Sequence, residues 1–194
     1  IGNRYGQSDT YESWQPRFDF SSIPVRLKPG RNDFLFKCLR GRLKVRLRRP
    51  PAPAFLNPRD LTLPDLILGE AANTRGAIVV VNATDQTLRN ARISVSGGGL
   101  LAQEAPVPDI LPLTVRKIAF PIEGPAPQAA GDLPIELTLL RNDRGRRTGL
   151  DKTTVTIRAV GPGEPQKRTY VSDVDDSVRH SAVLPRGPPY RPDA

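Results

Sequence analysis

The chain has 194 residues, a length that suits one ordinary domain or two small ones. Its 21 prolines and 16 glycines divide it into short segments, which favours strands and turns over long helices and predicts an all-β fold. With Cys38 as the only cysteine and His180 as the only histidine, it cannot form an internal disulfide, a cysteine metal cluster or a site that needs two imidazoles. The net charge of +9 is compatible with polyanion binding, but the base composition of a genome produces the same excess of arginine, and we favour that reading.

The first 20 residues are polar and aromatic without steady periodicity, and we expect them to form a loop that packs onto another part of the protein. The chain opens at Ile1 and contains no Met, so we expect it to be a piece of a longer protein. Three aromatic residues in this segment are candidates for stacking on a carbohydrate ring, although hydrophobic anchoring is the role that we favour. They are Tyr5, Tyr11 and Trp14.

A strand is predicted at 23–27, and the turn residues at 28–32 lead into a predicted hairpin over 34–48. A two-residue turn at 40–41 brings the alternating apolar residues of this hairpin onto one face. They are Phe34, Phe36, Cys38, Leu43, Val45 and Leu47. These strands predict a partial sheet at the start of the chain.

The opposite face of this hairpin is basic and is the candidate site for a polyanion. Its cations are Lys37, Arg42, Lys44, Arg46 and Arg48. Alternate residues of a strand stand about 7 Å apart, a distance comparable to the spacing of phosphates. No aromatic residue interleaves with these charges, so nucleic acid is not an expected partner. A solvated face, or contact with an acidic neighbouring domain, is the alternative that we favour.

A proline-rich linker at 49–53 separates the hairpin from a second unit. Beyond the linker, apolar alternation and turn residues recur at the spacing of a β-sandwich. The predicted strands are 65–68, 77–81, 88–95, 113–120, 133–140 and 152–160. Six or seven short strands over about 100 residues predict an immunoglobulin-like antiparallel β-sandwich.

A second linker at 161–165 leads to a predicted C-terminal β-hairpin, with strands at 168–174 and 177–184 around a turn at Asp175 and Asp176. The chain is therefore expected to contain three parts. They are a partial jelly-roll-like region at 1–60, the sandwich at 61–161, and a linker with the hairpin at 162–194.

The last hairpin, 170–178 with 182–185, resembles the segment that leads into the catalytic domain of some bacterial prolyl-oligopeptidase-like serine hydrolases of the α/β-hydrolase superfamily. The strands that begin at Leu66-Ile67-Leu68-Gly69-Glu70 resemble the sandwich upstream of such domains, and 25–47 resembles the closing strands of a galactose-binding-like jelly roll. Asp176 departs from the pattern, which has a glycine in the turn. The resemblance implies a parent serine hydrolase, and no catalytic residue carries over to this chain.

The residues themselves support neither catalysis nor metal binding. The G-x-S-x-G elbow of an α/β-hydrolase is absent, and His180 lies between serines of one predicted strand whose side chains point away from its ring. The acidic residues at 173–176 lack the glycine and the distal glutamate of a calcium loop. No cofactor is expected. Asn82-Ala83-Thr84 fits the glycosylation sequon, which matters only in a eukaryotic secretory context.

The sequence therefore leads to the hypothesis of a non-catalytic accessory segment of a larger serine hydrolase, either a peptidase or an esterase. Its role would be to position the catalytic domain or the substrate. The alternative is a free-standing β module that binds carbohydrate or polyanion. We expect a periplasmic or secreted location and no membrane span, because no apolar run approaches the roughly 20 residues that a spanning helix needs.

Overall fold

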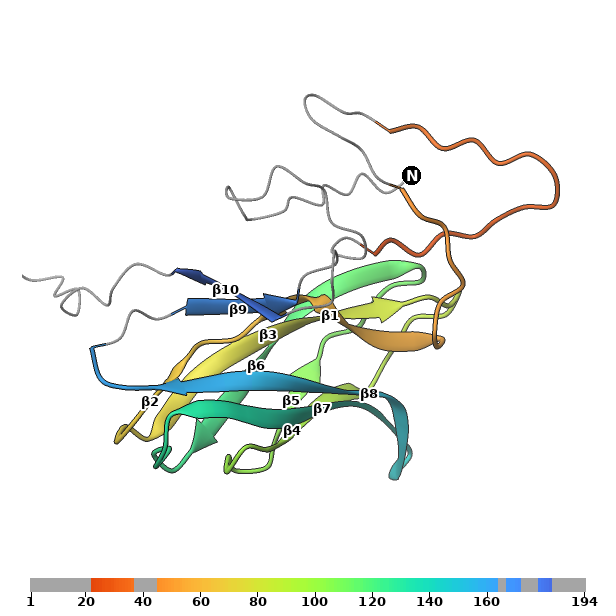
Figure 1. The fold of residues 1–194 in the computed structure, drawn as a ribbon. Coiled ribbons are helices and arrows are strands. Elements are labelled where there is room, and N and C mark those ends of the chain that lie inside the picture. Colours follow the sequence, from red (N-terminus) through yellow and green to blue (C-terminus); the bar gives the residue numbers. More distant parts are fainter. Residues whose placement is uncertain (1–21, 37–44, 164–166, 172–177, 183–194) are drawn as a thin grey trace, which may run out of the picture.

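The computed structural model describes residues 22–36, 45–163, 167–171 and 178–182, the last two ranges by the course of their backbone. These residues contain no helix, and the predicted all-β class is confirmed (Figure 1). The strands within them are β1 Ala54–Thr62, β2 Leu66–Ile67, β3 Ala72–Asn82, β4 Ala91–Gly97, β5 Gln103–Val107, β6 Thr114–Gly124, β7 Gly131–Asp143, β8 Arg146–Val160, β9 Lys167–Val171 and β10 Val178–Ala182.

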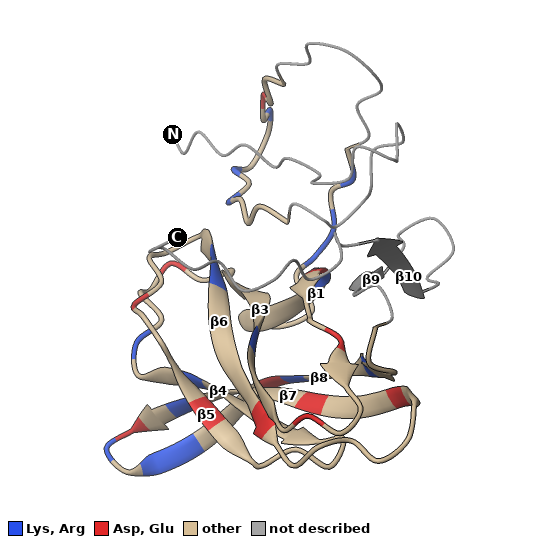
Figure 2. Ribbon diagram, turned by 90° about the vertical axis from the view of Figure 1, so that its left-hand side faces the viewer, with Lys and Arg blue, Asp and Glu red and all other residues tan. Residues whose placement is uncertain are grey.

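Two sheets pack against each other across one core (Figures 1 and 2). The three-stranded sheet has the order β1-β3-β6 and is antiparallel throughout. The five-stranded sheet has the order β2-β8-β7-β4-β5, in which the short β2 runs parallel to the end of β8 and the other pairs are antiparallel. The strands β9 and β10 form a separate antiparallel pair, and β9 lies next to β1.

The core follows from the alternation of apolar and polar residues along the strands. In β7, Ile135, Leu137 and Leu139 are fully buried, and the intervening Glu136 and Thr138 point to the outer face. Phe120 of β6 is also fully buried, in the same core. Burying each such side chain stabilises the fold by about 1.5 to 3 kcal/mol. The alternation therefore explains why the apolar sides of the two sheets pack against each other.

The chain changes sheets between β1 and β2. The first half of β1 pairs with β3, the register then shifts between Asn57 and Thr62, and β2 joins the opposite sheet beside β8. Leu61 and Leu63 are buried in the core along this crossing. The strand β1 runs across the boundary predicted at 60 and 61, and its pairing with β3 makes 54–60 part of the sandwich.

The six strands predicted for the sandwich are all present, although β3, β6, β7 and β8 are longer than predicted and β2 and β4 are shorter. The strand β5 was not predicted, because it contains Pro106 and charged Glu104. It lies at the edge of its sheet and pairs with β4 alone, a position in which a proline without an N–H removes no ladder hydrogen bond.

The prediction of strands before residue 50 is wrong for the described part of that region. Residues 22–36 and 45–50 form no strand, and most of them stand away from the two sheets (Figures 1 and 2). The turn of the predicted 34–48 hairpin lies outside the described residues. An isolated two-stranded hairpin is marginally stable, and within the described residues no third strand pairs with these segments to complete a sheet.

The C-terminal hairpin is confirmed as an antiparallel pair. Its register joins Val178 to Val171 and Ala182 to Lys167, so His180 lies opposite Thr169. The turn with Asp173, Asp175 and Asp176 is outside the described residues.

Candidate functional site

The most unusual surface of the described chain is a series of exposed apolar side chains before the sandwich, here called the apolar row. Each is between 44% and 100% exposed. The row consists of Ile23, Val25, Leu27, Phe34, Leu35, Phe36, Val45 and Leu47. Elsewhere in the described chain, the exposed large apolar residues are Leu101 and Leu111. Exposed apolar residues are thus concentrated in the two segments for which a partial sheet was predicted.

The local geometry of the row follows the alternation seen in the sequence. The rings of Phe34 and Phe36 stack with their centroids 6.4 Å apart and their planes 19° apart, as expected for alternate residues on one side of an extended segment. The turn predicted at 28–32 is present: Asn32 Oδ1 accepts the backbone N–H of Lys28, and Asn32 Nδ2 donates to the carbonyls of Lys28 and Gly30. The turn at 28–32 therefore joins the two parts of the row at 23–27 and 34–36.

One ion pair links the first segment to the sandwich. Arg26 Nη2 lies 2.8 Å from Asp85 Oδ2 in the loop between β3 and β4, and both side chains are about three-fifths exposed. An ion pair of this exposure contributes at most about 1 kcal/mol. The segment is tethered at this point, but the contact does not cover its apolar side chains.

The candidate binding residues from the sequence are only partly placed. Lys37, Arg42 and Lys44 lie outside the described residues, as do Tyr5, Tyr11 and Trp14. Arg46 and Arg48 are exposed, as predicted for the basic face, but each has an interaction partner of its own. The basic face of the hairpin therefore remains a prediction.

The glycosylation sequon falls on a residue that is needed inside the fold. The side chain of Asn82 is 1% exposed, and its Nδ2 donates to the carbonyls of Gln86, Ile110 and Leu111 at 2.8 to 3.1 Å. Its Oδ1 accepts from the N–H and the hydroxyl of Thr84. Asn82 thus joins two loops at one end of the sandwich, and its amide nitrogen is inaccessible to a glycan.

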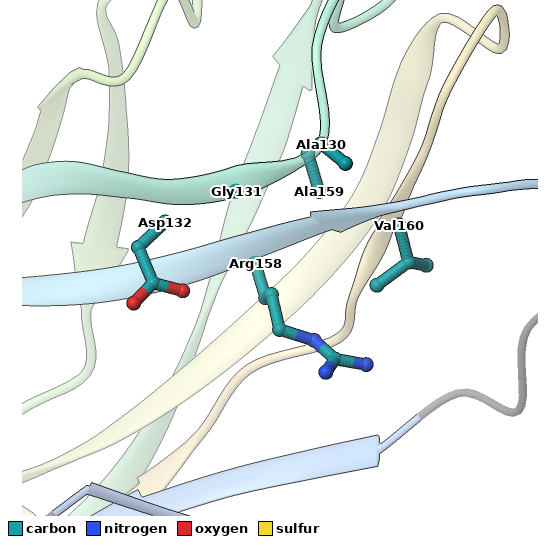
Figure 3. A pocket seen from close by; sticks show the side chains of 6 residues that line it. All are labelled: Ala130, Gly131, Asp132, Arg158, Ala159 and Val160. Atoms are coloured by element: carbon teal, nitrogen blue, oxygen red, sulfur yellow. The ribbon is translucent and has the colours of Figure 1, made fainter.

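A shallow, open depression lies where the start of β7 meets the end of β8 (Figure 3). Its lining consists of Ala130, Gly131, Asp132, Arg158, Ala159 and Val160. None of these residues is a serine, cysteine or histidine, so the depression offers no nucleophile for acyl transfer.

Arg158 Nη2 donates to Asp65 Oδ2 at 3.2 Å, and the Asp65 side chain is fully buried. This pair fixes the loop before β2 against β8.

The described residues contain no group of three His, Cys, Asp or Glu side chains placed to hold a metal ion. They also contain no helix of the length and apolarity needed to cross a membrane. No protein-family model matches this chain, and no curated protein sequence matches it either. The candidate site therefore rests on the geometry of the apolar row alone.

Proposed function

We propose that this chain is a non-catalytic accessory module, and that its apolar row docks against a neighbouring domain of the same protein. The observation that carries the proposal is the concentration of exposed apolar side chains in residues 22–36 and 45–50. A concentration of exposed apolar side chains beside a well-packed domain is typical of an interaction site. The sandwich beside it has an ordinary closed core, so the row is not the result of a poorly packed fold.

The neighbour that fits this surface best is a β-rich domain that supplies strands. Alternation at Ile23, Val25 and Leu27 and at Phe34 and Phe36 leaves one side of each segment apolar. The backbone of these segments makes no strand pairing within the described chain, so it is available to add to the sheet of a partner. Pairing would give the backbone N–H and C=O groups hydrogen-bond partners and would bury the apolar side chains at the same time.

We also propose that the sandwich is immunoglobulin-like. If β1, β3 and β6 correspond to strands A, B and E, and β4, β5, β7 and β8 correspond to C, C′, F and G, the strands of each sheet are those of an immunoglobulin domain. The order A-B-E opposite C′-C-F-G supports this proposal.

The parent of this module is proposed to be a serine hydrolase, a peptidase or an esterase. The support is the resemblance of the last hairpin to the segment that precedes such catalytic domains, together with the antiparallel pairing of β9 and β10. In that arrangement the module holds the catalytic domain or its substrate in position. The proposed location remains periplasmic or secreted.

Activity-based labelling tests this proposal. A fluorophosphonate probe, which reacts with activated serines, is incubated with this chain and with the longer gene product, and the labelled peptide is identified by mass spectrometry. We expect no labelling of this chain and labelling of a serine beyond residue 194 in the longer product. Labelling of any serine within residues 1–194, with turnover of a p-nitrophenyl ester that the label abolishes, would contradict a non-catalytic role.

A further inference from the structure

The hairpin formed by β7 and β8 extends beyond the strands beside it. The last pairing of β7 with β4 joins Arg141 to Ala91, followed by one hydrogen bond from the N–H of Asn142 to the carbonyl of Asn90. From there to the turn, the two strands pair only with each other in the described structure. All residues from 141 to 149 are exposed, so this end of the hairpin projects into solvent.

Four arginines and one aspartate occupy seven consecutive positions of this projection. We call the four arginines the arginine tip: Arg141, Arg144, Arg146 and Arg147. Blue segments in Figure 2 mark Lys and Arg, and they include this end of the five-stranded sheet. The pairing of β7 with β8, which brings the arginines of both strands together, is not visible in the sequence.

Neighbouring carboxylates neutralise only half of the arginine tip. Arg141 Nε lies 2.6 Å from Asp143 Oδ2, and Arg147 is ion-paired with Glu104 of β5. Among the described residues, neither Arg144 nor Arg146 has an ion-pair partner. Two guanidinium groups at the end of the projection are therefore available to an external anion.

The turn itself is built around an arginine in an unfavourable conformation. Arg144 has φ 49° and Gly145 has φ 82°, so both central residues are left-handed, as in a type I′ turn. Such turns strongly prefer Asn-Gly, and a side chain such as that of arginine destabilises this conformation. A residue that violates the local preference at an exposed, charged position is typical of a functional site.

From these observations we propose that the arginine tip binds an acidic polysaccharide, one that carries carboxylate or sulfate groups. Guanidinium groups bind such anions through paired hydrogen bonds that an ammonium group cannot form. The residues of the tip are exposed, and in the proposed complex the anionic groups of the polymer contact Arg144 and Arg146. This role lies beyond docking to a neighbouring domain and involves a different part of the chain.

Single-stranded nucleic acid fits this site less well. The strands β7 and β8 contain no aromatic residue on which a base could stack, which single-stranded nucleic acid requires. Duplex DNA is bound through many phosphate contacts along its axis, whereas the arginine tip offers two guanidinium groups without an ion-pair partner in the described chain.

The test measures binding of a fluorescein-labelled heparin oligosaccharide to the full chain by fluorescence anisotropy, at about 50 mM and about 300 mM salt. The tip variant is the pair R144N and R146T, in which Asn suits the turn and Thr suits the strand. The matched control is the pair R75N and R116T on β3 and β6, two exposed arginines without an ion-pair partner in the described chain. Each double variant removes two positive charges from the net charge of +9.

We expect the tip variant to lose affinity about tenfold or more, the control pair to change it less than about threefold, and binding to weaken at the higher salt. Equal losses in both variants would show attraction to the net charge alone and would overturn the site. Absence of binding of the oligosaccharide to the unaltered chain at low salt would also overturn the site. A DNA duplex that binds the tip more tightly than the oligosaccharide would overturn the assignment to polysaccharide. All of these outcomes leave the docking role of the apolar row unaffected.

Discussion

The carboxylate of Asp151 accepts a hydrogen bond from the backbone N–H of Leu56 at 2.8 Å, which joins β8 of the five-stranded sheet to β1 of the other. The N–H is supplied by a residue that is only 3% exposed, so water cannot replace the bond. This contact closes one side of the sandwich at the point where the chain begins to change sheets.

Removing this acceptor is expected to destabilise the fold. We expect Asp151→Ala to lower the free energy of unfolding by about 1 to 3 kcal/mol, because a buried N–H loses its partner, and Asp151→Asn to lower it less, because the amide oxygen still accepts. The measurement is the midpoint of urea unfolding. Asp132→Ala, at an exposed position on the neighbouring strand β7, is the control and should change stability by less than about 0.5 kcal/mol. An equal effect of both alanine variants would contradict a closing role for Asp151.

The bonds of Asn82 predict a second sensitive position. Asn82→Asp replaces the Nδ2 donor by a carboxylate oxygen that faces the carbonyls of Gln86, Ile110 and Leu111. We expect a loss of about 3 kcal/mol or more, since a buried charge would face only acceptors on that side. The same change at the exposed Asn73 of β3 is the control for the added charge. Thermal unfolding of both variants measures the difference, and similar melting temperatures would show that the Asn82 bonds do not stabilise the loops.

The close approach of β3 to Phe120 predicts a third effect. A Cβ at Gly76 would lie 2.5 Å from Phe120 Cζ and 3.0 Å from Leu63 Cδ2, distances that no packed core accommodates without movement. We expect Gly76→Ala to lower stability by about 1 to 3 kcal/mol. Gly149→Ala, at a position with open space and no left-handed backbone, should be nearly neutral. In a double-mutant cycle, adding Phe120→Leu should cost less in the Gly76→Ala background than alone, and strict additivity would contradict the predicted overlap.

The conformation of Arg144 predicts a change in the opposite direction. Arg144→Asn should raise the free energy of unfolding by a few tenths to about 1 kcal/mol, because Asn tolerates the left-handed conformation that the turn imposes. Urea unfolding with an unchanged m-value checks this expectation. A destabilised variant would mean that the arginine is favoured by the turn itself, and the case for a functional tip would lose that support.

Local patterns in the sequence predicted much of the sandwich. Ile135, Leu137 and Leu139 alternate with polar residues, and this period of two already specifies both a strand and its buried face. The turn at 28–32 was likewise predictable, because the Lys-Pro-Gly-Arg-Asn run concentrates turn-forming residues.

Features that depend on distant contacts were not predictable. The strand β5 forms only because β4 provides a partner for a segment with poor intrinsic preference for strand, including Pro106. The burial of Asn82 results from carbonyls 28 and 29 residues away. The same reasoning explains the error before residue 50: alternation predicts which side of a strand is apolar, but it does not supply the partner that makes the strand form.

Hydrogen–deuterium exchange across residues 22–50 tests the central claim most directly, in this chain and in the longer gene product in which the proposed neighbouring domain is present. We predict fast exchange of amides at 23–36 and 45–49 in this chain, and at least about tenfold slower exchange in the longer product, with β3 and β7 protected equally in both. Fast exchange of these amides in both proteins would contradict docking of the apolar row, as would full protection in this chain alone.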